Sequence, residues 1–458
     1  MLPAMQSTKF HFASALTALG WQDDVTVTVD ANGMIGSVTA GSREGEHVAG
    51  IAIPAMPNVH SHAHQRFMLG LAERAGPGAD SFWTWREAMY GFALRLSPDD
   101  LEAVAAQLYV EMLKSGFSVA GEFQYLHHQP DGRPYANPAE MSLRCVAAAE
   151  QAGIAITALP TLYAYGGFGG KAPVEGQRRF INDAARFLDI YSRLAAAAKD
   201  HPLQRVGISP HSLRAVTPDL LREVIAGIAP DAPIHVHVAE QTKEVDDCIA
   251  FCGLRPVEML MDHFDLSPRW TAIHATHMTM DETTRLARSG AIAGLCPTTE
   301  ANLGDGIFPA VDFMRAKGSI AIGSDSHISV SPAEDLRMLE YSQRLRDRTR
   351  NALASGPGQS TGRTLFEAAA KGGAISMAQP VGAIEVGKRC DIAMLDADHP
   401  SLIGRCEDAA LDTWIFSGGN ACVKDVFVAG RPVVKDRRHI NEDQIARAFR
   451  AAIGRLSA

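Results

Sequence analysis

The stretch AGIAIPAMPNVHSHAHQ, residues 49–65, decides the fold because it joins an apolar run to a pair of histidines. His60 and His62 stand at positions i and i+2, so in an extended strand their side chains point to the same side. Two imidazole nitrogens can then reach one metal ion. In a chain with 17 histidines the pair needs further ligands, since two polar residues at a strand end would look the same.

Strand-like apolar runs alternate with helical stretches after this point. Helical periodicity marks residues 99–115, 182–199 and 218–228. With the opening run 49–56 there are eight expected strands, the others being 118–123, 155–159, 205–209, 233–238, 270–274, 291–295 and 320–324. Eight β/α units in sequence predict an α/β fold, a (β/α)8 barrel of the TIM type, whose active site lies at the C-terminal ends of the strands.

Both ends of the chain carry short strands separated by turns. They are expected at residues 10–13, 25–30 and 34–38, and again at 391–396, 422–430 and 431–434, with a closing helix in 440–458. Neither end has enough strands for its own core, so we expect both ends to pair into one small β-sandwich. The predicted domains are a composite sandwich of residues 1–54 and 379–458 and a catalytic barrel of residues 55–378.

Composition narrows the class of protein. The 458 residues are 46% hydrophobic and 21% charged, as in soluble globular proteins, and no apolar run is long enough to cross a bilayer. The first ten residues lack the features of a signal peptide, so we expect a cytoplasmic protein. Seven scattered cysteines do not form a disulfide framework. A net charge of -9 argues against nucleic acid or a membrane as partner, but a local arginine pair could still bind a small anionic substrate.

Two more residues at predicted strand ends complete a ligand set. His237 is placed to be the third ligand and Asp325 the fourth, at the ends of the fifth and eighth expected strands. Each alone has an ordinary explanation, a hydrogen-bonded strand histidine or a turn, but together with His60 and His62 they indicate a metal site. Three neutral imidazoles and a carboxylate suit one divalent ion per subunit, Zn2+ first and Fe2+ second, with a water completing the site.

These residues resemble the signature of the amidohydrolase superfamily, in its mononuclear deaminase branch. The resemblance rests on His60, His62, His237, Glu240, His274 and Asp325, and on residues 387–393, where Cys390 replaces the usual alanine. No lysine stands in residues 209–212, so a binuclear centre is not expected. The resemblance implies that Asp325 takes a proton from the metal-bound water, that Glu240 shuttles protons and that His274 polarises the attacked group. A solvated carboxylate at a helix start is the alternative for Glu240.

Within the superfamily, residues 62–66, 82–90, 121–128 and 209–216 resemble deiminases of histidine degradation. Those enzymes release ammonia from the amidine of a glutamate derivative. The resemblance to them also implies a homodimer. Arg86 and Arg214 would hold the carboxylates of such a substrate in bidentate fashion. Gln65 and Tyr125 would hydrogen-bond the substrate, and His211 would orient it near the metal. The alternatives are a stacked surface cation for Arg86 and a strand-end aromatic for Tyr125.

Two other functions stay open. One is a deaminase of a guanine- or adenosine-like heterocycle, whose pocket would favour aromatic stacking over two arginines. The other is a non-catalytic barrel scaffold, in which one or more of the expected metal-ligand residues would be missing. The glycine-rich residues 165–170 lack the pattern of a nucleotide-binding loop and are expected to form an active-site flap.

Overall fold

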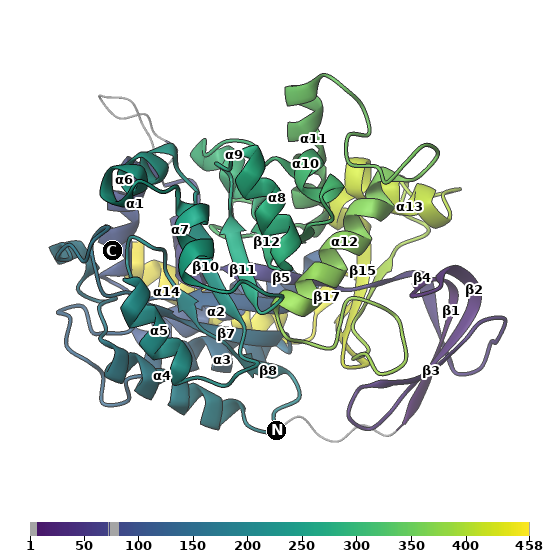
Figure 1. The fold of residues 1–458 in the computed structure, drawn as a ribbon. Helices are drawn as coiled ribbons and strands as arrows, with labels where there is room; N and C mark the ends of the chain where they lie inside the picture. The colour runs from purple at the N-terminus through teal and green to yellow at the C-terminus, as the bar shows by residue number, and fades with distance from the viewer. Residues whose placement is uncertain (1–6, 72, 74–81, 458) are drawn as a thin grey trace.

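The protein is described here by a computed structural model, which covers residues 7–71, 73 and 82–457. The chain start, residues 1–6, on which the signal-peptide prediction rests in part, and residue 458 lie outside the described residues. Figure 1 shows parallel strands in the middle of the molecule, helices such as α4, α5, α7 and α8 around them, and the purple strands β1 to β3 at one end. None of the described helices is both long and apolar enough to cross a membrane.

The central strands form two parallel sheets. The first contains β5 (Met56–Ser61), β6 (Phe117–Gln124), β7 (Ala155–Leu162) and β8 (Gln204–Val206), with the short β9 (Ser209–Pro210) also paired to β7. The second contains β10 (Ile234–Val238), β11 (Trp270–His274), β12 (Ile292–Leu295) and β13 (Ser319–Ile322). Every residue of β6, β7, β10 and β11 is buried, as expected for parallel strands covered by helices.

Isolated parallel bridges link the two sheets at both of their edges. Ile208 bridges to Ile234 and Ser212 to His237 at one junction, and Ser61 bridges to Asp325 at the other. At the second junction the Asp325 amide donates to the carbonyl oxygen of His60 at 2.9 Å. The first central strand therefore lies directly beside the segment that follows the last one, which places the histidine pair next to Asp325.

Helices fill the connections between the strands. They are α1 (Phe82–Ala93), α2 (Pro98–Ser115), α3 (Glu140–Ala152), α4 (Ala184–Ala198), α5 (Pro218–Ala226), α6 (Thr242–Cys252), α7 (Pro256–His263), α8 (Met280–Ser289), α9 (Pro297–Leu303), α10 (Ala310–Arg315), α11 (Pro332–Asp347) and α12 (Thr361–Ser376). Helix α2 illustrates the local signals: Ser97 and Asp100 form a capping box, and Gly116 ends the helix with φ 102°. The three predicted helical stretches correspond to α2, α4 and α5.

Strands from both chain ends form a single eight-stranded sheet. From the start come β1 (Thr8–Thr17), β2 (Gly20–Val29), β3 (Ile35–Thr39) and β4 (Glu46–Pro54), and from the end β14 (Ile392–Leu395), β15 (Val423–Val428), β16 (Arg431–Lys435) and β17 (Arg438–His439). The halves join where β4 pairs antiparallel with β14. Helices α13 (Glu407–Thr413) and α14 (Glu442–Ser457) complete this region. The shared sheet matches the prediction, and its division into two layers remains a prediction.

One predicted strand was placed wrongly. The apolar run up to Pro54 is not the first central strand, because it forms β4 of the end sheet, and the central strand β5 begins at Met56. Ile51, Ala52 and Ile53 are all buried, so the run shows no alternation that would reveal its sheet. The chain passes from one sheet to the other at Ala55.

Candidate active site

The four predicted ligands come together at the carboxyl ends of β5, β10 and β13. Nε2 of His237 lies 3.0 Å from Nε2 of His60. Oδ1 of Asp325 lies 3.4 Å from Nε2 of His60 and 3.5 Å from Nε2 of His62. All four side chains are buried, with His60 fully inaccessible. Ligand atoms of His60, His62 and His237 lie within 4.8 Å of one another, and those of His60, His274 and Asp325 form a second group of the same spacing, which suits a single metal centre.

Hydrogen bonds on the far side of the imidazoles fix which nitrogen faces the centre. Nδ1 of His62 donates to the carbonyl oxygen of Phe123 at 2.9 Å, and Nδ1 of His237 donates to that of His211 at 2.9 Å. Nε2 of both rings therefore carries a lone pair toward the cluster. Burial lowers the pKa of His60, His62 and His237, so all three are neutral near pH 7. Neutral imidazoles with inward lone pairs fit a divalent metal ion.

The backbone around this cluster adopts an uncommon conformation. Ala239, His274, Ala275, Asp325 and His327 have φ between 46° and 67°, in the left-handed region that residues other than glycine seldom occupy. Each of them lies at or just after the end of β10, β11 or β13. Such strain persists where the surrounding structure imposes it, and it gathers at functional sites.

Glu240 and His274 lie beside Asp325. Oε1 of Glu240 is 3.9 Å from Nε2 of His274, which is 3.8 Å from Oδ2 of Asp325. Burial raises the pKa of Glu240 to about 7, although His274 and Arg214 act to lower it. Burial acts to lower the pKa of His274, but Glu240, Glu300 and Asp325 raise it to about 10. Glu240 is only 5% exposed, so the solvated-carboxylate alternative is wrong.

Three buried carboxylates near the site were missed by the sequence reasoning. Glu300 accepts from Nδ1 of His274 at 3.2 Å, and Asp305 contacts Gln241, the residue after Glu240. Glu122 accepts from Ser61, between the two histidines. No local motif identifies Glu300 or Asp305. For Glu122 the available signal was its position in an otherwise apolar strand run, where an acidic residue requires a buried partner.

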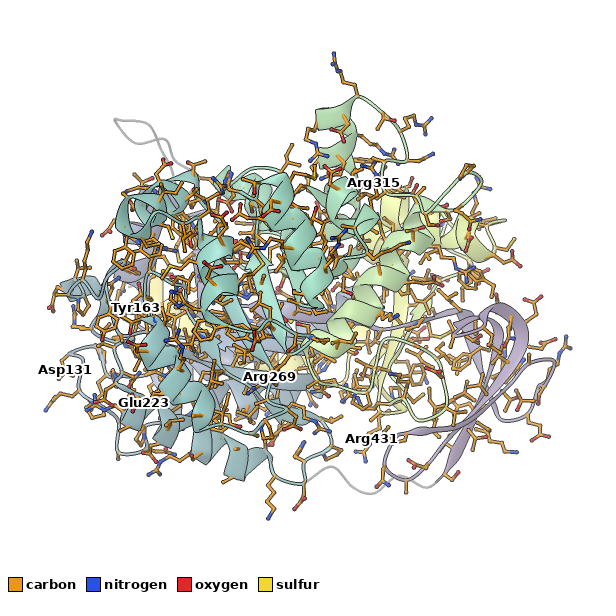
Figure 2. The ribbon with its side chains drawn as sticks, in the orientation of Figure 1. Asp131, Tyr163, Glu223, Arg269, Arg315 and Arg431 are labelled. Atoms are coloured by element: carbon orange, nitrogen blue, oxygen red, sulfur yellow. The ribbon has the colours of Figure 1, made fainter. Side chains whose placement is uncertain are left out.

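A pocket with a cavity volume of about 50 Å³, open to solvent, leads to the cluster. It contains the predicted Arg86 and Arg214, and also His62, His237, Glu240, His274 and Asp325. Its other walls are largely aromatic, formed by Phe82, Trp85, Tyr90, Tyr163 and Phe180. Figure 2 shows Tyr163 on the side of the molecule away from Arg431 of the end sheet. The pocket combines a polar floor with two cations on its wall, a composition suited to a small anionic ligand.

The two arginines come from different segments and share one aromatic neighbour. Arg86 lies on α1, with its guanidinium carbon 4.5 Å from the centre of the Trp83 ring, and that of Arg214 is 5.8 Å from the same centre. Both Nε atoms are buried without a hydrogen-bond partner in the described part of the chain. Arg86 is therefore a stacked cation, as one alternative had it, but it stacks inside the pocket.

The remaining predicted residues also face this pocket. Nε2 of Gln65 and Nε2 of His64 lie 3.0 and 2.8 Å from the hydroxyl oxygen of Tyr125, and Oε1 of Gln65 is buried without a partner among the residues that the structure describes. His211 lines the pocket beside Tyr163, with ring centres 4.6 Å apart. All the predicted site residues are thus gathered in one place, while the roles given to them stay predictions.

An α/β fold with imidazoles and carboxylates gathered at the carboxyl ends of its parallel strands defines a hydrolytic enzyme. The chain belongs to the amidohydrolase family, whose family model matches residues 51–433.

Comparison with individual proteins agrees with this assignment. The chain is 50% identical over 446 residues to formimidoylglutamate deiminase of Pseudomonas aeruginosa, covering 96% of this chain and 98% of that protein. It is 27% identical, over 88% of this chain and 86% of the relative, to a 5-methylthioadenosine/S-adenosylhomocysteine deaminase of Natronomonas pharaonis. A crystal structure of an amidohydrolase from Brucella melitensis superposes with a TM-score of 0.93 at 49% identity, covering 98% of this chain and all of that one.

A more distant structure, an adenosine deaminase from Xanthomonas campestris with bound zinc, gives a TM-score of 0.82 at 20% identity and covers 98% of both chains. This likeness concerns the fold.

Proposed function

We propose that this protein is a formimidoylglutamate deiminase, which hydrolyses N-formimidoyl-L-glutamate to N-formyl-L-glutamate and ammonia in histidine degradation. The observation that carries the proposal is the pair of half-buried guanidiniums, Arg86 and Arg214, in the pocket that ends at the ligand cluster, each with an Nε atom that is buried without a hydrogen-bond partner among the described residues. A buried donor without an acceptor is costly, and a carboxylate supplies that acceptor. A substrate with two carboxylates satisfies both, and the 50% identity to a deiminase of that name supports this choice.

The residues divide the chemistry between the two ends of the pocket. At the wall, Arg86 and Arg214 bind the two carboxylates and set the length of the substrate. At the floor, a divalent metal held by His60, His62, His237 and Asp325 would supply a water activated at neutral pH. Asp325 accepts the proton of the attacking water. His274, held as a cation, stabilises the amidine group while its carbon is attacked.

Glu240 completes the reaction by moving protons. Its pKa near 7 lets it exist in both protonation states at neutral pH, which suits a group that accepts a proton and then donates it. Water adds to the amidine carbon and its first proton passes to the terminal nitrogen. The second proton then moves from the new hydroxyl group to the same nitrogen through Glu240, and the bond from carbon to that nitrogen breaks to release ammonia as the formyl carbonyl forms. Gln65, Tyr125 and His211 orient the amidine beside this carboxylate.

The competing heterocycle deaminase receives less support. The aromatic lining of the pocket suits a flat ring, but a neutral purine offers the two guanidiniums no carboxylate. An inactive scaffold predicts a missing ligand, whereas the three histidines form one group and Asp325 lies 3.4 Å from His60 and 3.5 Å from His62.

Ammonia release from N-formimidoyl-L-glutamate by zinc-loaded protein tests the proposal. The same preparation is given guanine and an adenosine derivative in parallel. Release from the glutamate compound alone is expected. Release from a heterocycle alone would keep the metal chemistry and remove the substrate roles of Arg86 and Arg214.

The architecture, the metal ion, the oligomeric state and the location of the protein are further parts of the same proposal. We propose that the eight central strands form a closed barrel of residues 55–378, and that residues 1–54 and 379–458 form a two-layered second domain. Bridges at both sheet junctions support closure. Zn2+ as the single ion in each subunit, Fe2+ as its substitute, a homodimer and a cytoplasmic location are further parts of the proposal, and metal analysis and ultracentrifugation test the first three.

A further inference from the structure

Glu122 is a buried carboxylate that the proposed reaction does not use. It lies on β6, is 1% exposed, and makes three hydrogen bonds as an acceptor. Oε2 accepts from the hydroxyls of Ser61 at 2.8 Å and Tyr109 at 3.0 Å, and Oε1 accepts from the amide of Ala63 at 2.8 Å. In the part of the chain that the structure describes, no lysine or arginine forms an ion pair with it.

Two of these contacts, with Ser61 and Ala63, hold the segment that carries the first two predicted metal ligands. Ser61 lies between His60 and His62, and Ala63 follows directly. Phe123, the residue after Glu122, accepts from Nδ1 of His62. Two adjacent residues of β6 therefore hold residues 61, 62 and 63 in place. The hydroxyl of Tyr109 adds a connection to α2, which fixes the carboxylate itself.

We propose that Glu122 is a positioning residue for the metal site, which holds the His60-Ser61-His62 segment in place through its hydrogen bonds to Ser61 and Ala63. The inference rests on the proposed metal site. The geometry gives it one effect: the hydrogen bonds fix the separation of the two predicted ligands before the ion arrives.

Burial alone leaves an isolated carboxylate poorly stabilised. It raises the pKa of Glu122 to about 7, even though bonds from Ala63, Ser61 and Tyr109 act to lower it.

The test is the zinc affinity of folded Glu122→Gln, measured by competition with a chromogenic chelator. We expect the dissociation constant for zinc to rise about 10- to 100-fold, the usual effect of removing a group that orients metal ligands. Glutamine keeps the size of the side chain but removes the charge and cannot accept all three bonds. Glu122→Asp retains the charge and should recover part of the affinity.

Glu340 offers a control on α11. It is also fully buried, and it accepts from the amides of Ala352 at 2.8 Å and Leu353 at 3.0 Å and from Nε of Arg344 at 2.6 Å. Glu340→Gln should lower stability but leave zinc affinity at the wild-type value. If Glu122→Gln behaved in the same way, losing stability alone, the positioning role would be wrong.

Ser61→Ala keeps the proposal testable if Glu122→Gln does not fold. This variant removes one donor and no charge, so a smaller, severalfold rise in the zinc dissociation constant is expected. Unchanged affinity in Ser61→Ala, alongside an unfolded Glu122→Gln, would overturn the positioning role. Failure of wild-type protein to bind zinc would instead refute the proposed metal site, so the two failures are distinct.

Discussion

Nδ1 of His274 lies 3.2 Å from Oε1 of Glu300, a carboxylate that is 4% exposed and begins no motif in the sequence. Oε1 of Glu300 also accepts from the amide of Cys296 at 2.9 Å, which fixes its position. The imidazole therefore has carboxylates on both of its nitrogens, Glu300 on one side and Glu240 with Asp325 on the other. These carboxylates raise the pKa of His274 to about 10, so the imidazole is cationic at neutral pH.

Glu300→Gln should lower kcat by on the order of 10²-fold, the scale of a proton-transfer contribution, because the amide removes one of the charges that keep His274 protonated. Metal content should stay at the wild-type level. Steady-state kinetics over pH, with metal analysis of each sample, checks this. A kcat equal to that of wild type across the range would exclude Glu300 from the chemistry.

Arg214→Ala should raise KM about 10- to 100-fold, because a hydrogen bond to a charged group contributes about 1.5–3 kcal/mol. Bound metal should be retained, since the guanidinium does not belong to the ligand cluster. The control is Arg222→Ala, an exposed arginine on α5 that pairs with Asp219 and should change nothing. An unaltered KM in Arg214→Ala would remove this residue from substrate binding.

Glu240→Gln should lower kcat by about 10²- to 10⁴-fold while KM changes little, because glutamine can still hydrogen-bond but cannot carry protons. Zinc titration of the variant should match that of wild type. Loss of metal in the variant would instead make Glu240 a ligand and require a different proton carrier.

The stability of the metal-free protein should depend on pH through Glu122. Its folded pKa, raised by burial to about 7, exceeds the ordinary value of 4.5, so the folded state holds this proton more tightly than the unfolded chain. The resulting stability is fully present below about pH 4.5 and is lost as pH rises through 7. The contribution of Glu122 to the free energy of unfolding changes by about 3 kcal/mol across this pH range.

Urea unfolding of metal-free wild type and Glu122→Gln between pH 4.5 and 8 measures this effect. The wild type should lose stability relative to the variant as pH rises. Parallel curves would show that the carboxyl is not titrating in this window.

The sequence indicated the ligands because strand periodicity constrains them. His60 and His62 share a side by parity, and His237 and Asp325 follow apolar runs of a repeating β/α pattern, so their meeting at one edge could be predicted. The substrate-side residues Arg86 and Arg214 depended on resemblance, since nothing in their local sequence shows which way they point.

Other features depend on contacts between distant segments. The carboxylates Glu300 and Asp305 approach His274 and Gln241 only after α9 packs, so no short pattern reveals them. The apolar run 49–54 was assigned to the wrong sheet for the same reason: its partner strand, β14, begins at Ile392 and is far away in the sequence.

The hydrogen bond from Asp325 to His60 joins two positions that are far apart in the chain. His60 and His62, the proposed first two metal ligands, leave the ribosome early, but the carboxylate beside them stands 265 positions after His60. A chain released before Asp325 would carry histidines without a complete site, and contacts of such large sequence separation form slowly. Because an ion that binds only the folded state stabilises it, zinc uptake would mark the moment at which the whole catalytic region has assembled.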